Sequence, residues 1–132
     1  MSKKMWEPSK ARVKDTRMYE YMRFVNDRYG KTFNKYDELH NWSVTSTSDF
    51  WASLWDYLEV IHSRPYEYVV DDATKMPGAT WFEGARLNIA ENLLRYRDDR
   101  PAIKCAAEWT QNVKTMTHAE LYSAVAKAAS TL

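Results

Sequence analysis

The chain has 132 residues, of which 45% are hydrophobic and 14% aromatic, enough apolar material for a buried core in a domain of ordinary size. Its 19 basic and 18 acidic side chains nearly cancel, so no overall field would attract nucleic acid or an anionic membrane. One cysteine excludes an internal disulfide, and the sequence shows neither a signal peptide nor a run of roughly 20 apolar residues, so we expect a cytosolic protein with no membrane partner.

Residues 1–14 are polar and are expected to form a flexible arm, in which Trp6 is the one large apolar side chain that could anchor it. Basic residues gather around this arm at Lys3, Lys4, Lys10, Arg12, Lys14 and Arg17. Glu7 and Asp15 interrupt them, so a solvated entry segment suits the pattern better than an anion-binding arm.

The first helix is predicted from Asp15 or Thr16, either of which can cap it, to Gly30, which is a natural stop. Its apolar residues recur at helical spacing and form one stripe: Met18, Met22, Val25 and Tyr29. Such a stripe is typical of core packing. The alternation of aromatic and basic residues here therefore does not indicate a surface that stacks nucleic-acid bases.

Two further helices are predicted between residues 34 and 61. The first begins near Asn34 and closes at Trp42, and Ser46 with Asp49 has the spacing of a short capping box for the second. The second helix carries a broad apolar face made of Phe50, Trp51, Leu54, Trp55, Leu58 and Ile61.

The helical period breaks at residues 62–65, where Pro65 disfavours helix at the preceding residue. Residues 66–70 are predicted to be extended, and residues 71–80 form a loop that leads to a corner at Trp81. Gly84 can turn the chain there, and Asn88 or a neighbour can start another helix. The apolar face of that helix would contain Ile89, Ala90, Leu93, Leu94 and Tyr96.

After Pro101 the sequence pattern changes from helical to strand-like. Strands are predicted over residues 102–107 and 113–116 with a turn at 109–112, followed by a helix opened by a capping box of Thr117 and Glu120. The inward residues of that helix would be Leu121, Ala124, Val125, Ala128 and Leu132. The fold class is therefore predicted to be α+β, with a mainly helical region followed by a β-hairpin and a helix.

Residues with catalytic chemistry are poorly grouped. Three dispersed glycines cannot build a phosphate-binding loop, and three widely separated histidines lack the spacing of a zinc site. The neighbouring carboxylates of Asp71 and Asp72 are better explained by their loop than by acid–base work, and Cys105 is expected to be a buried, unreactive thiol. We therefore predict no catalytic, cofactor-binding or metal-binding residue in this chain.

Three blocks in a fixed order carry a family resemblance: YDELHNWSV (36–44), DFWASLW (49–55) and WFEGARLNIAENLLR (81–95). Together they resemble the N-terminal region of acetoacetyl-CoA synthetases, which are acyl-adenylate-forming enzymes. Acetyl-CoA synthetases share part of this pattern but usually continue toward N-x-x-DRH. The AENLLR continuation seen here thus favours acetoacetate over acetate. The residues that we assign to this structural motif are Trp42, Phe50, Trp51, Trp55, Trp81, Phe82, Gly84, Arg86, Asn88 and Asn92.

The resemblance implies an arm at 1–14, an acetyl-CoA synthetase-type helical region at 15–100, and the incomplete start of the large adenylate-forming, AMP-binding domain at 101–132. The full-length enzyme would use ATP, Mg²⁺ and CoA to convert acetoacetate to acetoacetyl-AMP and then to the thioester, with the motifs for these ligands beyond residue 132. This stretch would be structural and inactive alone, and its partner would be the remainder of that enzyme. For Arg86 we expect a pairing with a carboxylate or backbone carbonyls.

Two alternatives stay open at this point. The parent enzyme could be a short-chain acyl-CoA synthetase that acts on acetate or propionate, or the chain could be a non-catalytic short isoform that serves as an interaction module. The sequence does not distinguish a fragment, a truncated gene model and an isoform. Alone, the chain is expected to expose apolar helix faces and an unpaired strand edge.

Overall fold

The computed structural model describes residues 5–108 and 112–131, and the chain in it forms two compact units. The first takes in Met1–Val60 and Pro65–Ala85, and the second Ile61–Arg64 and Arg86–Leu132. Of the sequence-based expectations, Lys3 and Lys4, most of the turn at 109–112, and Leu132 fall outside the described residues.

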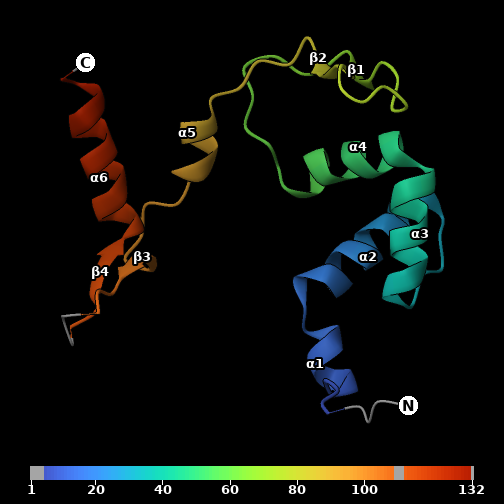
Figure 1. The fold of residues 1–132 in the computed structure, drawn as a ribbon, viewed down its shortest axis with the longest axis horizontal. Helices are drawn as coiled ribbons and strands as arrows, with labels where there is room; N and C mark the ends of the chain where they lie inside the picture. The colour runs from blue at the N-terminus through green and yellow to red at the C-terminus, as the bar shows by residue number, and fades with distance from the viewer. Residues whose placement is uncertain (1–4, 109–111, 132) are drawn as a thin grey trace. The chain divides into compact units, whose positions relative to one another are not determined.

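The elements confirm the mainly helical α+β class (Figure 1). The helices are α1 (Lys10–Lys14), α2 (Arg17–Tyr29), α3 (Tyr36–Thr45), α4 (Thr47–Tyr57), α5 (Ile89–Leu93) and α6 (His118–Ala129). The strands are β1 (Tyr68–Val70), β2 (Trp81–Glu83), β3 (Pro101–Cys105) and β4 (Lys114–Thr117). None of the described helices is long and apolar enough to cross a membrane.

Helix α2 begins and ends where local sequence predicts. The Thr16 hydroxyl accepts a hydrogen bond from the Tyr19 N–H at 3.2 Å, and Gly30 closes the helix in the left-handed conformation with φ of 61°. The short α1 is an addition to the predicted arm, capped by Ser9, whose hydroxyl accepts from the Arg12 N–H. Trp6 does not anchor this arm in a core, since its side chain is 68% exposed and lies against the Arg12 guanidinium.

The core of the first unit lies where α2, α3 and α4 meet. Its buried residues are Tyr21, Met22, Val25, Leu39 and Trp42. Helix α4 adds Ser53, which is fully buried and was not predicted. The Tyr21 hydroxyl and the Ser53 hydroxyl lie 2.6 Å apart, and Ser53 also donates to the Phe50 carbonyl at 2.7 Å. A small polar residue therefore fits the centre of an aromatic core because its hydroxyl is fully paired.

Helix α4 departs from its prediction at both ends. The Ser46 side chain makes no capping hydrogen bond, so the predicted capping box is wrong. The helix ends at Tyr57 rather than near Ile61, and Glu59 turns the chain with φ of 49°. Leu58 is consequently exposed instead of facing the core.

Strands β1 and β2 pair antiparallel, with Tyr68 opposite Glu83 and Val70 opposite Trp81. The extended run at residues 66–70 was predicted, but its partner was expected to be only a corner. A three-residue strand leaves little periodicity to read, so the pairing was not visible in the sequence.

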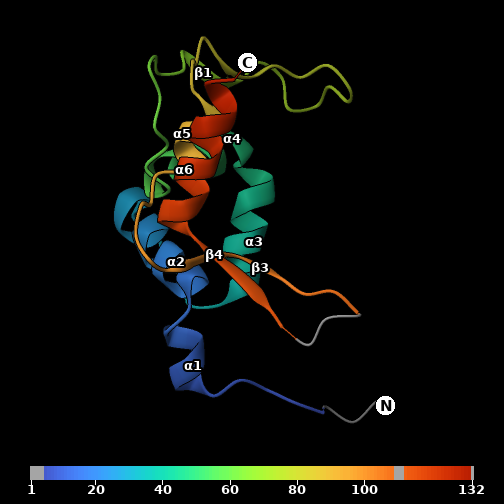
Figure 2. The same ribbon diagram turned by 90° about the vertical axis from the view of Figure 1, so that its left-hand side faces the viewer.

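In the second unit, β3 and β4 form an antiparallel hairpin with an irregular register near Pro101, and α6 continues from β4 (Figure 2). The capping box of Thr117 and Glu120 is confirmed, with hydrogen bonds of 3.2 and 2.8 Å. The predicted inward faces of the last two helices are not enclosed. Ile89 and Leu93 are 69% and 70% exposed, and Val125 is 37% exposed. The reason is that one hairpin and two helices cannot surround these side chains within this unit.

Candidate functional site

The aromatic residues of the predicted motif gather in the first unit. Trp55 of α4 lies 4.9 Å from Phe82 of β2 between ring centroids, and both rings contact Tyr66, at 5.2 and 5.4 Å. Trp55 is only 9% exposed. This cluster joins α4 to the β1–β2 pair, and it surrounds Phe82, whose φ of 50° is unusual for a bulky residue.

A second line of rings connects the remaining aromatic members of the motif. Trp42 meets Phe50 at 6.2 Å, Phe50 meets Trp51 at 5.4 Å, and Trp51 meets Trp81 at 5.8 Å, all with edge-to-face geometry. Trp42 is buried, whereas Trp51 and Trp81 are about 40% exposed. The line therefore runs from the helical core to the surface.

Gly84 turns the chain after β2, as predicted, with φ of 80°. A Cβ atom at this position would lie 2.9 Å from the Oε1 of Glu67 and 3.1 Å from its Cγ. The Glu67 N–H also donates to the Glu83 carbonyl at 2.8 Å, which holds the neighbouring backbone close. Glycine is thus required for its backbone conformation, whereas the exposed Glu67 side chain would only have to shift to make room for a Cβ.

Arg86 is held through its backbone rather than its side chain. Its N–H donates to the Arg64 carbonyl at 3.0 Å, and its own carbonyl accepts from the Ser63 N–H at 2.8 Å and the Ser63 hydroxyl at 3.1 Å. The guanidinium is exposed and makes no hydrogen bond or ion pair with the residues that the structure describes. Its pairing with a carboxylate or carbonyls stays a prediction for the longer protein.

The two asparagines of the motif perform different tasks. Asn88 caps α5, as predicted, because its Oδ1 accepts from the Ala90 and Glu91 N–H groups at 2.9 and 3.4 Å. Asn92 reaches Ile61, 31 residues earlier, and pairs with both of its backbone groups. The asparagine Oδ1 accepts from the Ile61 N–H at 2.9 Å, and the Nδ2 donates to the Ile61 carbonyl at 2.8 Å.

Arg95 completes this arrangement by donating from Nη2 to the Asn92 Oδ1 at 2.9 Å. The side-chain amide of Asn92 therefore pairs with both the backbone N–H and the backbone carbonyl of Ile61, as a neighbouring strand would. The sequence analysis assigned Asn92 to the structural motif but gave it no specific role. The available signal was an amide within an otherwise amphipathic helix, but nothing local identified Ile61 as its partner.

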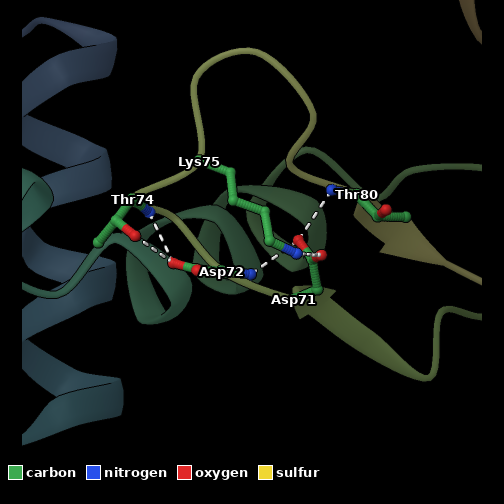
Figure 3. A network of polar contacts seen from close by, with 5 residues as sticks. All are labelled: Asp71, Asp72, Thr74, Lys75 and Thr80. Atoms are coloured by element: carbon green, nitrogen blue, oxygen red, sulfur yellow. Dashed lines mark hydrogen bonds and ion pairs between the residues drawn. The ribbon is translucent and has the colours of Figure 1, made fainter.

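The loop between β1 and β2 contains the polar network drawn in Figure 3. The Asp71 carboxylate accepts from the Lys75 ammonium at 2.6 Å, the Thr80 N–H at 2.8 Å and the Asp72 N–H at 2.7 Å. These donors, led by Lys75, lower the pKa of Asp71 from 3.8 to about 2.

Asp72 accepts from both the N–H and the hydroxyl of Thr74, which lowers the pKa of its carboxyl too. A pair suited to acid–base work would have its two pKa values pushed apart. Here both carboxylates stay ionised and close a loop, as expected from the sequence.

Other titratable groups are scattered. His40 lies in α3 against Tyr36, and His118 begins α6 against Tyr96. Within residues 5–108 and 112–131, no three His, Cys, Asp or Glu side chains are grouped so that they could hold a metal ion. Cys105 is exposed at the end of β3, so the expectation of a buried thiol is wrong. The strand pairs with β4 along one edge, and the other side chains at its end are exposed as well.

The three glycines lie in separate segments of the chain. Gly30 ends α2, Gly78 lies in the loop between β1 and β2, and Gly84 follows β2. The arrangement of the described residues therefore offers no cradle for the phosphates of a nucleotide. The motif residues instead make aromatic ring contacts and hydrogen bonds to the backbone, which hold neighbouring segments together.

Comparison with known proteins gives a consistent result. Residues 36–93 match the family described as acetyl-coenzyme A synthetase N-terminus. The acetoacetyl-CoA synthetase of Rattus norvegicus is 41% identical over 124 residues, which cover 92% of this chain and 18% of that protein. The malonamoyl-CoA synthetase vrtB of Penicillium aethiopicum is 49% identical over 82 residues, which cover 61% of this chain and 11% of that protein.

Among solved structures, acetoacetyl-CoA synthetase from Streptomyces lividans matches with a TM-score of 0.88 and 36% sequence identity. The match covers 99% of this chain and 21% of that one. The chain therefore spans about a fifth of the length of its relatives. By sequence and by fold, it belongs to the N-terminal region of the acetoacetyl-CoA synthetase family.

Proposed function

We propose that this chain is the N-terminal structural region of an enzyme that activates acetoacetate with ATP to acetoacetyl-AMP and transfers the acyl group to CoA. The observation that carries the proposal is the likeness to proteins named acetoacetyl-CoA synthetase, which extends over 92% of the chain in sequence and 99% in fold. The AENLLR continuation of the third block supports the same acyl substrate.

In this proposal the chemistry belongs to the remainder of the enzyme. That remainder would bind ATP, Mg²⁺ and CoA, and the whole protein would work in the cytosol. The present chain would supply the helical layer of the first unit and the opening hairpin and helix of the adenylate-forming domain. Exposed apolar side chains in the second unit fit this role, because the remainder of the enzyme could bury them. They are Ile89, Leu93, Tyr96, Ile103 and Val125.

The acyl group deserves a separate test, because the malonamoyl-CoA synthetase is 49% identical over the part that it shares with this chain. Likeness in this region is therefore compatible with more than one acyl substrate. A short-chain acyl-CoA synthetase that acts on acetate or propionate remains the second candidate.

The experiment is to supply the full-length protein with ATP, Mg²⁺ and CoA together with acetoacetate, acetate, propionate or malonamate. We expect acetoacetyl-CoA and AMP to form fastest. A higher kcat/KM for another acid would move the assignment to that acid. If no acid gives a thioester, the proposed enzymatic role fails altogether.

A further inference from the structure

The charge of the chain is unevenly distributed. Residues 3–17 hold six basic and two acidic side chains, a net charge of +4, whereas the whole chain has a net charge of +1. The other residues together therefore carry a net charge of −3. We call residues 3–17 the basic arm. The near-neutral charge of the whole chain does not exclude an anionic partner for this arm.

The two acidic residues of the basic arm lie outside its helix. Glu7 precedes α1, Asp15 is its C-cap, and the five residues of α1 include three basic side chains and no acid. All three basic side chains are exposed: Lys10, Arg12 and Lys14. Lys10 and Lys14 lie one helical turn apart on the same side of α1. The acids that interrupt the basic residues in sequence therefore leave α1 itself entirely basic and neutral.

Two large apolar side chains beside α1 also face solvent. Met5 is 98% exposed and Trp6 is 68% exposed. Figure 2 shows α1 beyond the end of α2, away from α3 and α4. The Arg12 guanidinium lies over the Trp6 ring, 5.7 Å from its centroid. An indole beside a cation suits the boundary between lipid and water, where tryptophan is enriched because it combines an apolar body with a polar N–H.

We propose that the basic arm binds the surface of an anionic lipid bilayer. Its lysine and arginine side chains would lie near the anionic headgroups, and Met5 and Trp6 would insert between the headgroups and the acyl chains. Each basic residue near such a surface strengthens binding by roughly fivefold, so the arm would attach the protein reversibly. This goes beyond the proposed function, since it concerns where the protein lies. It departs from the expectation of no membrane partner, which followed from the charge of the whole chain.

A nucleic acid is the other polyanion that the charge of the basic arm would fit. The exposed apolar pair favours lipid, because a phosphate backbone offers Met5 no apolar contact. In addition, the Arg12 guanidinium already lies over the Trp6 ring, on which a base would have to stack.

Sedimentation of the full-length protein with vesicles tests the proposal. We expect binding to vesicles made of equal parts phosphatidylcholine and phosphatidylserine, weaker binding at higher salt, and none to phosphatidylcholine alone. Replacing two lysines of α1 together, Lys10→Gln with Lys14→Gln, should lower the affinity about 30-fold.

The matched control removes the same charge at two exposed positions outside the basic arm, Lys31→Gln with Lys127→Gln, and should leave the affinity unchanged. Lys31 follows α2, whose 13 residues separate it from the arm by about 20 Å, beyond the screening length of about 10 Å. Absence of binding to the phosphatidylserine vesicles overturns the proposal, and so does an equal loss of affinity in the two double variants.

Trp6→Ala tests the apolar contribution, since it leaves the charge unchanged. It should weaken binding to the phosphatidylserine vesicles several-fold, and an unaltered affinity would contradict insertion of the arm. Binding to polyuridylic acid but not to vesicles would assign the arm to nucleic acid and reject the proposal. None of these measurements uses an acyl substrate, so their failure would leave the proposed function intact.

Discussion

Two residues of the motif are chosen for reasons that the structure makes explicit. Gly84 combines a left-handed backbone with the close approach of Glu67, and Asn92 pairs with both backbone groups of Ile61. A side chain at position 84 would strain the backbone and crowd Glu67. A side chain at position 92 without an amide would lose the hydrogen bonds to Ile61. These positions are therefore expected to tolerate substitution less well than their exposed neighbours.

Gly84→Ala should lower the free energy of unfolding by about 1–2 kcal/mol, because alanine is strained at a φ of 80° and the exposed Glu67 side chain must also shift away from the added Cβ. Gly30→Ala is the matched control, since Gly30 is also left-handed but has open space around it. It should cost only about 1 kcal/mol. Urea unfolding followed by tryptophan fluorescence compares the two. Equal losses would show that Glu67 does not restrict the turn.

Asn92→Ala should cost about 1–2 kcal/mol, since the N–H and carbonyl of Ile61 lose their partner together. Amide hydrogen exchange at Ile61 should become faster at the same time. Glu91→Ala, a neighbouring exposed position on α5, should change neither quantity appreciably. Unaltered amide exchange at Ile61 in the Asn92 variant would contradict a stabilising role for the hydrogen bonds between Asn92 and Ile61.

At the scale of elements, the loop between β1 and β2 links stability to pH. The pKa of Asp71 is lowered from 3.8 to about 2, so its ionised form stabilises the folded loop. This contribution is fully present above pH 3.8 and is lost as the pH falls toward 2. We expect Asp71→Asn to weaken the pH dependence of the Tm in that window. Asp27→Asn, which removes an exposed carboxylate from α2, is the control and should preserve the wild-type slope.

The elements that the sequence predicts well are those with local signals. Thr16, Gly30, Asn88 and the pair of Thr117 and Glu120 mark helix ends through contacts within four residues, and all of them are seen. The pairing of β2 with β1 and the contact of Asn92 with Ile61 join segments far apart in the chain. No local pattern identifies such partners, because any extended run or backbone group could satisfy them.

Apolar periodicity was informative about faces but not about what covers them. It correctly placed Met22 and Val25 in a core, although Met18 of the same predicted stripe is 51% exposed. The same pattern in α5 and α6 marked faces that the described residues leave exposed. A periodic stripe indicates that a helix needs a partner, and it does not say whether the partner lies within the same 132 residues.

At the scale of the whole molecule, the chain forms two compact units, each held together by its own contacts. The described residues contain neither a metal-binding cluster nor a phosphate-binding loop. The relatives are about five times as long, which leaves ample chain for the chemistry that their names describe. These observations support the proposal that this stretch is a structural part of a longer acyl-adenylate-forming enzyme, whose chemistry would lie in the remainder of that enzyme.

Acetoacetate-dependent exchange of pyrophosphate into ATP tests that claim most directly, because it reports adenylate formation before CoA is involved. The full-length protein and residues 1–132 would be assayed side by side with Mg²⁺. We predict exchange by the full-length protein and none by residues 1–132. Exchange catalysed by residues 1–132 alone would contradict the account.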